Sequence, residues 1–282
     1  MKKIIKHLLK FFMISKDINT ALSKGTLGSS TRMIDYSKPL TWEFSAFSQN
    51  GEDGILDVLV NNLINVNKVF IEIGSANGLA NNTAYLAIVK NYTGFLIEGG
   101  KWNSFISKLV YRYFNRGVKS IHSFVTLDNI EDILKGLPVK SPDLFCIDID
   151  GNDYYIVEKA LELGYLPSIF ICEYNATYGP SRSITIPYSS NFNYEIAHET
   201  RLYYGVSIKA WTNLFKKYGY VFISVDSNGI NSFFVKRDSF NKEFLDNIIP
   251  VSFIDNVMEK ISFNKHWSER FNLINDMPFE TK

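Results

Sequence analysis

Residues 69–78 read Val-Phe-Ile-Glu-Ile-Gly-Ser-Ala-Asn-Gly, and this stretch decides the fold. An apolar run broken only by Glu72 is followed at once by Gly74 and, four positions later, Gly78. A buried strand that ends in a glycine-rich turn before a helix is the first unit of a doubly wound α/β sheet. Glycine at these positions lets the backbone turn tightly and approach a ligand that a side chain would exclude.

Further strands and helices alternate on the C-terminal side of this turn. Short apolar runs predict strands at 94–97, 120–125, 144–149 and 168–172. Between the first two of these runs, a helical repeat predicts four inward-facing side chains, Phe105, Ile106, Leu109 and Val110. Two later runs, 220–225 and 232–235, flank an Asp-Ser-Asn-Gly turn and predict an antiparallel hairpin. We therefore predict an α/β fold with a doubly wound, mostly parallel, seven-stranded, Rossmann-like sheet that ends in this hairpin.

The chain is predicted to contain three parts. Residues 1–40 form an amphipathic helix and a connector, residues 41–238 form the α/β domain with a substrate loop at 174–206, and residues 239–282 form a helical extension that packs on it. Residues 1–15 carry their lysines on one helical face. This pattern predicts either a peripheral contact with an anionic membrane surface or packing against the domain or a partner subunit.

The composition excludes several classes of protein. With 282 residues, of which 46% are hydrophobic, the chain can bury a core of ordinary size without disulfides or metals. No apolar run reaches the length of about 18 residues that a membrane-spanning helix needs. The net charge of +1 argues against a nucleic-acid partner. Cys146 and Cys172 lie within apolar runs, which predicts buried, reduced thiols and a cytoplasmic protein.

Two acidic residues end neighbouring strands of the predicted sheet. Glu72 lies where a pyrophosphate would be repelled, so a cationic ligand fits this turn better than a dinucleotide does. Glu98 follows it by 26 residues and is placed to accept hydrogen bonds from two ribose hydroxyls. The acids and glycines together predict a site for a positively charged, adenosine-bearing small molecule. The alternative is a pair of solvated acids at strand ends.

Four stretches of the chain together resemble the class I S-adenosylmethionine-dependent methyltransferases, and more closely the FkbM-type group. They are Ser48–Gly54, Phe70–Gly78, Phe124–Thr126 and Ile147–Gly151, and the resemblance covers about residues 44–237. It implies S-adenosyl-L-methionine as the cofactor, with the methionine end near the glycine turn, the ribose at Glu98 and the adenine near Val125. The implied cofactor-binding residues are Gln49, Asp53, Glu72, Gly74, Ser75, Asn77, Gly78, Glu98, Val125, Thr126 and Asp148. The chain departs from many relatives in having Gly99-Gly100 where they carry a proline.

Acidic residues also end the fourth and fifth predicted strands. Side chains alternate along a strand, so Asp148 and Asp150 point the same way and can share a pocket with Glu173. The three carboxylates could hold Mg²⁺ or another hard divalent ion, supply a general base with a raised pKa, or cap the next helix. We favour the metal-free use, in which the catalytic residues are Asp150, His198 and Asp148.

The stretch 174–206 has little helical period and is rich in Tyr and Asn. A structureless loop of this length is usually functional or disordered, and its aromatic and amide groups suit a polar, hydroxyl-rich substrate. His198 is the one histidine in this stretch and could act either as a base or as an ordinary surface residue. The predicted substrate contacts are Glu173, Asn175, Arg182 and Arg201.

The predicted activity follows from the resemblance. It is methyl transfer from S-adenosylmethionine to an oxygen of a sugar or another small polar acceptor, in surface-glycan or secondary-metabolite biosynthesis. The Asp148-Ile-Asp150 sequence leaves open a metal-dependent glycosyltransferase that binds a nucleotide diphosphate sugar. A third possibility is a non-catalytic module that keeps the cofactor pocket without turnover.

Overall fold

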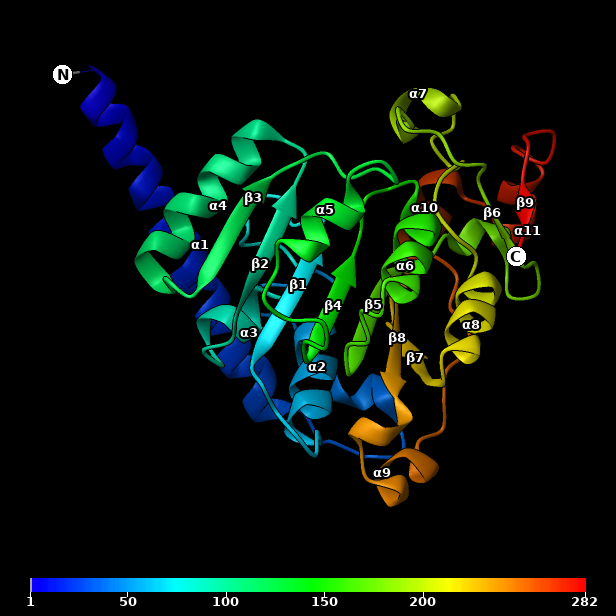
Figure 1. Cartoon of the computed structure of the whole chain (residues 1–282), viewed down its shortest axis with the longest axis horizontal. Helices are drawn as coiled ribbons and strands as arrows, with labels where there is room; N and C mark the ends of the chain where they lie inside the picture. The colour runs from blue at the N-terminus through cyan, green and yellow to red at the C-terminus, as the bar shows by residue number, and fades with distance from the viewer. Residues whose placement is uncertain (1) are drawn as a thin grey trace.

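The computed structural model describes the backbone of residues 2–282 and the side chains of residues 16–282. Its centre is a seven-stranded sheet in the order β3-β2-β1-β4-β5-β8-β7 (Figure 1). The strands are β1 (Val69–Ile73), β2 (Thr93–Glu98), β3 (Val118–His122), β4 (Leu144–Ile147), β5 (Ile169–Glu173), β7 (Tyr220–Val225) and β8 (Asn231–Lys236). The first five run parallel, and β8 runs antiparallel to both β5 and β7. The predicted fold, including the hairpin, is confirmed.

The order of the strands creates a switch point between β1 and β4. From β1 the chain winds outward through β2 to the edge strand β3, and it then crosses to β4 and winds the other way through β5. Both central strands are buried, as strands covered by helices on both faces must be. In open α/β sheets of this kind, ligands bind outside the carboxyl ends of the strands at the switch point.

Helices cover both faces of the sheet. One face carries α2 (Glu52–Asn61), α3 (Ala84–Ile88), α4 (Lys101–Phe114), the short η1 turn (Pro39–Trp42) and the C-terminal part of α1 (Lys2–Thr31), which buries Ile18 and Ala21 in the same core. The other face carries α5 (Ile130–Lys135), α6 (Asp153–Glu162) and α8 (Ile208–Lys217). Cys146 and Cys172 are buried free thiols in adjacent strands, as predicted.

Two expectations around the sheet edge are wrong, the second in part. The third strand ends at His122, not at Val125. In α4, Val110 is buried and Ile106 packs on the core as expected, but Phe105 and Leu109 point to solvent with 45% and 41% of their surface exposed. Two of the four predicted inward side chains therefore lie on the outer face of the helix, where packing against the sheet does not account for them.

The stretch 174–206 is not a structureless loop. It contains η2 (Ala176–Tyr178), β6 (Ile184–Thr185) and α7 (Tyr194–Ala197), and β6 pairs with β9 (Glu280–Thr281) at the C-terminal end. The C-terminal segment also contains η3 (Arg237–Ser239), α9 (Lys242–Asn247), α10 (Val257–Phe263) and α11 (Trp267–Phe271). A separate small core joins the two stretches through Tyr178, Ile186, Leu202, Tyr203 and Ile274. The extension therefore holds the loop in place.

A buried arginine ties the extension to the loop. Arg270 is completely buried, and its Nη2 lies 2.6 Å from Asp255 Oδ1 and 3.2 Å from Glu259 Oε2. Its Nε donates to the hydroxyl of Thr177 in η2, and the same hydroxyl donates to Glu259. A buried charge is tolerated only with such a set of partners.

None of the helices in the described part of the chain combines the length and the apolar character that crossing a bilayer requires. The predicted contact of residues 1–15 with a membrane or a partner subunit falls on side chains outside the described ones.

We predict that Arg270→Ala lowers the free energy of unfolding by about 3–5 kcal/mol, because it leaves two largely buried carboxylates without their cation. Urea unfolding followed by circular dichroism measures the change. The exposed Arg237→Ala variant is the control, and it is expected to stay within about 0.5 kcal/mol of the parent protein. A loss below about 1 kcal/mol in the Arg270 variant would show that this network does not hold the extension in place.

Candidate functional site

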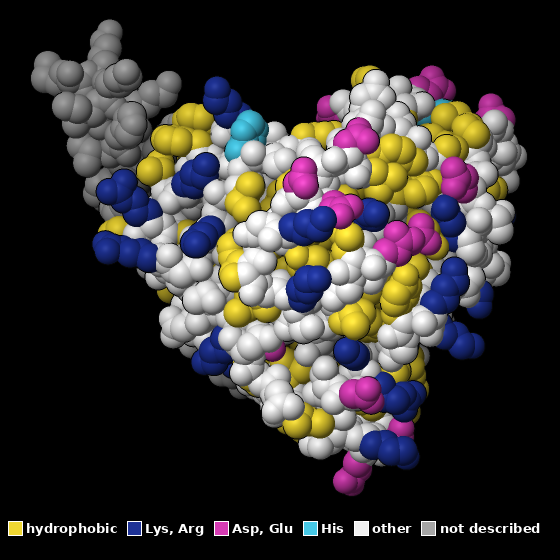
Figure 2. Space-filling view, in the orientation of Figure 1, with side chains coloured by type: hydrophobic (Ala, Val, Ile, Leu, Met, Phe, Trp, Pro, Cys, Tyr) yellow, Lys and Arg dark blue, Asp and Glu magenta, His cyan; other side chains and the backbone are white. Residues whose placement is uncertain are grey.

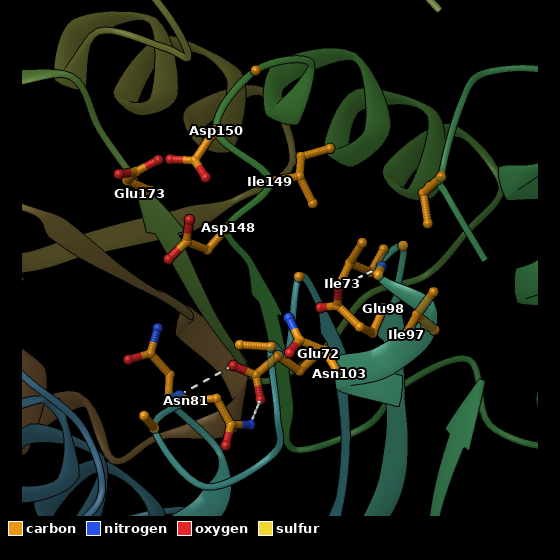
Figure 3. Close-up of a pocket in the computed structure, with 18 of the residues that line it drawn as sticks. Glu72, Ile73, Asn81, Ile97, Glu98, Asn103, Asp148, Ile149, Asp150 and Glu173 are labelled. Carbon is orange, nitrogen blue, oxygen red and sulfur yellow. Dashed lines mark hydrogen bonds between the residues drawn. The ribbon is translucent and has the colours of Figure 1, made fainter. Parts of the chain in front are cut away.

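A cavity of about 560 Å³ opens at the switch point, at the carboxyl ends of β1, β2, β4 and β5 (Figure 3). Pockets for small molecules span about 300–1,000 Å³. Eight of the predicted site residues line it: Gln49, Glu72, Gly74, Glu98, Val125, Asp148, Asp150 and Glu173. Phe192 is the one residue of the 174–206 loop in the lining.

Gly74 is required by the contact between strand ends. Its φ is +88°, and a Cβ on it would lie 1.7 Å from the carbonyl oxygen of Asp148. Gly78 also has a positive φ, of +77°, but it packs against Ser107 and Tyr111 and does not line the cavity. Of these two glycines, Gly74 borders the cavity and Gly78 has a packing role, so a ligand contact at Gly78 stays a prediction.

Glu72 is fully buried beneath the cavity wall. Its carboxylate accepts hydrogen bonds from the Asn81 side chain, the Asn82 N–H and the Thr83 hydroxyl (Figure 3). Burial raises the pKa of this carboxyl. The carboxylate oxygens of Glu72 thus hold the turn between β1 and α3 in place. Their direct contact with a cationic ligand remains a prediction.

Glu98 ends β2 at the far side of the cavity from the acidic cluster (Figure 3). Its Oε1 accepts the N–H of Gly100 at 2.6 Å, which fixes the carboxylate at the cavity wall. A Cβ on Gly100 would lie 2.8 Å from the same oxygen, so the second glycine of the Gly99-Gly100 pair leaves room for this bond. The side chain of Asn103 lines the wall beside it and was not anticipated from the sequence.

Asp53 does not line the cavity but organises the loop that does. Its Oδ2 accepts three backbone N–H bonds, from Ala46 and Phe47 at 2.7 Å and from Ser48 at 3.0 Å. The Ser48 hydroxyl accepts the Asp53 N–H in return. Burial raises the pKa of Asp53 to about 7. The carboxylate of Asp53 thus holds the turn that brings Gln49 to the cavity, and a direct cofactor contact of Asp53 stays a prediction.

Two residues that the sequence did not single out connect this turn to the hairpin. Glu52 accepts the Asn50 N–H at 2.7 Å and the Asn231 side chain at 2.7 Å, and all three residues line the cavity. Glu52 could have been found, because it lies inside the Ser48–Gly54 stretch. Asn231 is the first residue of β8 and carries no local signal.

Asp148, Asp150 and Glu173 meet at the other end of the cavity, where each offers one oxygen within 4.8 Å of the others (Figure 3). Burial, followed by the neighbouring carboxylates, raises the pKa values of Asp148 and Glu173. Burial and Asp153 raise the pKa of Asp150 to about 6. The predicted shared pocket is confirmed, and the three oxygens also suit a hard divalent ion.

The structure gives neither Asp148 nor Asp150 a capping role. The N-cap residue of α6 is Asn152, which makes no side-chain cap hydrogen bond. Asp153, the first residue of the helix, fixes the preceding loop: its Oδ1 accepts the Ile149 N–H at 3.0 Å, and its Oδ2 accepts the Gly151 N–H at 2.9 Å. Asp148 and Asp150 are therefore available to the cavity. Asp150 has a φ of 52°, which is uncommon for a residue other than glycine.

Three predicted cofactor residues lie outside the cavity lining. Ser75 is fully buried, Asn77 accepts the Leu79 N–H within its own turn, and the Thr126 carbonyl accepts the Ile130 N–H at the start of α5. The lining excludes all three.

Four predicted substrate or catalytic residues also lie outside the lining. Asn175 is buried, and its amide donates to the carbonyls of two later loop residues. Arg182 lies 3.8 Å from the centre of the Phe271 ring, and His198 contacts the Thr200 hydroxyl. Arg201 is exposed. The first three side chains thus contact other parts of the loop or the extension, and Arg201 faces solvent.

No protein-family model matches the chain, and no curated protein matches it. Among solved structures, it is similar to an O-methyltransferase from Bacillus cereus, with 13% identity, coverage of 77% of this chain and 89% of the other, and a TM-score of 0.41. It is also similar to a precorrin-6y C5,15-methyltransferase from Geobacter metallireducens GS-15 (14% identity, coverage of 64% and 86%, TM-score 0.38). A third similar structure is an S-adenosylmethionine-dependent methyltransferase from Aquifex aeolicus (9% identity, coverage of 66% and 90%, TM-score 0.40). The fold itself rests on the strand order and direction given above.

We predict that Asp53→Ala lowers the free energy of unfolding by at least about 3 kcal/mol, because three buried N–H groups lose their acceptor and each costs about 1–3 kcal/mol. Asp53→Asn keeps one acceptor oxygen and is expected to lose less. Thermal and urea unfolding of the two variants measure the difference. Equal stability of the alanine variant and the parent protein would remove Asp53 from its role in this turn.

Proposed function

We propose that this protein is a methyltransferase that uses S-adenosyl-L-methionine. The charge of the cavity carries the proposal. Its lining holds six carboxyl side chains, and no Lys, Arg or His occurs among its described residues. The six are Glu52, Glu72, Glu98, Asp148, Asp150 and Glu173. Such a wall attracts a cation, and S-adenosylmethionine carries a sulfonium and an ammonium group in addition to a ribose.

Glu98 suits the ribose. A carboxylate at the end of the second strand of a doubly wound sheet is placed to accept two ribose hydroxyls, and the bond from Gly100 holds this one in position. Val125 lines the cavity next to this end and is the proposed neighbour of the adenine. The resemblance to the FkbM-type group supports the same orientation.

The acidic cluster suits the acceptor. When bound, S-adenosylmethionine supplies an activated methyl group, so the protein needs mainly to orient the acceptor and receive its proton. Asp150, with a pKa of about 6, is ionised at neutral pH and can accept the proton of a hydroxyl group. Asp148 and Glu173, whose pKa values are also raised, can share protons and hydrogen-bond a polar acceptor. We therefore propose O-methylation of a sugar or another small polar acceptor, as in glycan or secondary-metabolite biosynthesis.

The second candidate is a metal-dependent glycosyltransferase. It is favoured by one observation, the three carboxylates within 4.8 Å of one another. A nucleotide diphosphate sugar would bring at least two further negative charges into a cavity already lined by six carboxyl side chains. One divalent ion does not offset that charge, so this candidate is the weaker one.

We predict that S-adenosylhomocysteine binds with a dissociation constant near 1 μM, which corresponds to a binding free energy of about 8 kcal/mol. Glu98→Gln should weaken binding by roughly tenfold to a hundredfold, because losing one charge-assisted hydrogen-bond partner costs about 1.5–3 kcal/mol. Isothermal titration calorimetry measures both constants. Glu162→Gln, an exposed change on α6, is the matched control and should bind as the parent does. Unchanged affinity in the Glu98 variant would contradict the ribose assignment. Binding of a uridine diphosphate sugar with Mn²⁺ but not of S-adenosylhomocysteine would favour the second candidate.

Turnover separates the metal-free mechanism from the metal-dependent one. In the metal-free mechanism, a chelator should not change the rate at which S-adenosylhomocysteine forms as a sugar acceptor is methylated. It should fall as the pH drops below about 6, because protonation removes the base at Asp150. Asp150→Asn should lose about a hundredfold or more. Chelator-sensitive turnover that Mg²⁺ restores would show instead that Asp148, Asp150 and Glu173 hold an ion.

A further inference from the structure

The outer face of α4 carries large apolar side chains that the fold does not bury. Trp102, Phe105, Leu109 and Tyr113 have 57%, 45%, 41% and 68% of their surface exposed. They recur every three or four residues, so at about 100° per residue they lie along one stripe of the helix. The opposite face, which packs on the sheet, buries Ser104, Ser107, Val110 and Tyr111. The helix thus has apolar side chains on both faces, and those on the outer face are more than covering the sheet requires.

Cations border this stripe, and acids are missing from it. Lys101, Lys108 and Arg112 are exposed along one edge of the stripe, and Arg116 is exposed just after the helix ends at Phe114. The stretch from residue 99 to residue 127 contains no Asp or Glu. Among the described side chains, none of these four cations takes part in a salt bridge. Figure 2 shows the result at upper left, where dark blue and yellow side chains lie together over α4 and magenta side chains are absent.

We propose that this face of α4 docks on an anionic lipid surface. Exposed aromatic and leucine side chains beside lysine and arginine, along one face of a helix, are the features that let a helix lie in the headgroup region of a bilayer. The apolar groups enter the acyl boundary, and the cations meet the lipid phosphates.

Other partners fit this face less well. A second copy packed face to face would bring the four cations of one chain against the same four of the other, which is repulsive. A single-stranded nucleic acid needs a groove that follows its backbone, whereas this face is the convex side of one helix. Both partners are outcomes that the following experiment distinguishes.

The test measures binding of the full chain to vesicles of equal parts phosphatidylglycerol and phosphatidylcholine, by co-sedimentation at low salt, with pure phosphatidylcholine vesicles as the comparison. The parent protein should bind only the anionic vesicles and be released by 0.5 M salt, roughly the range where the screening length falls to a few ångströms. Lys108→Glu with Arg112→Glu should reduce the partition coefficient at least tenfold. Lys216→Glu with Lys217→Glu makes the same change in charge on α8, far along the sheet, and should change it less than twofold. All variants should keep the unfolding temperature of the parent.

Trp102 gives a second readout at the proposed face. It is much more exposed than Trp42 and Trp211, which are completely buried, so a shift of tryptophan emission to shorter wavelength on adding anionic vesicles should disappear in Trp102→Phe. Phe105→Ser with Leu109→Ser should also weaken binding at least tenfold. No binding by the parent, or equal loss in the α4 and α8 charge variants, would overturn the proposal. The proposal would also be overturned if the parent formed a concentration-dependent dimer, or bound a single-stranded oligonucleotide, and the α4 variants abolished that association but still bound vesicles.

Discussion

The contact between the ends of β1 and β4 is the constraint on which the cavity depends. At Gly74 the backbone has a positive φ, and its α-carbon comes so near the carbonyl of Asp148 that no side chain fits between them. The two strands are neighbours at the point where the winding of the chain changes direction. Their ends are held together while the following loops leave in opposite directions, so a hollow must form there. Glu98 and the Asp148, Asp150 and Glu173 group therefore open on one cavity from two sides.

The crowding of carboxyl groups gives the cavity its chemistry. Three acids this close cannot all be ionised without a cation, so they titrate as a coupled set. Burial and mutual repulsion raise the pKa values of Asp148 and Glu173, whereas that of Asp150 rises only to about 6. Asp150 is thus the member that is ionised at neutral pH. Its neighbours can keep protons and donate hydrogen bonds, so the same group can both accept a proton and orient an acceptor oxygen.

The sheet and the two ends of the cavity could be predicted from local signals. Strand periodicity and the glycine turn fix the sheet, and alternation along β4 places Asp148 and Asp150 on one side. The partners of individual polar side chains could not be predicted in this way. Asp53 accepts backbone N–H groups of its own turn, and Arg182 contacts Phe271 of the extension. The position of a polar residue near a motif indicates that the residue has a role. The sequence does not say whether the partner of its side chain is a ligand or the backbone.

The net charge of +1 conceals two opposite surfaces. Six carboxyl groups line the cavity, while the α4 face is cationic, and only two residues lie between Glu98 and Lys101. A molecule docked through α4 would therefore hold the Glu98 end of the cavity near the lipid surface. Glu173 belongs to β5, three strands from β2 in the sheet, which is about 14 Å at the usual strand spacing. An acceptor bound at the acidic end would then enter from the side of the 174–206 loop, away from the docked face.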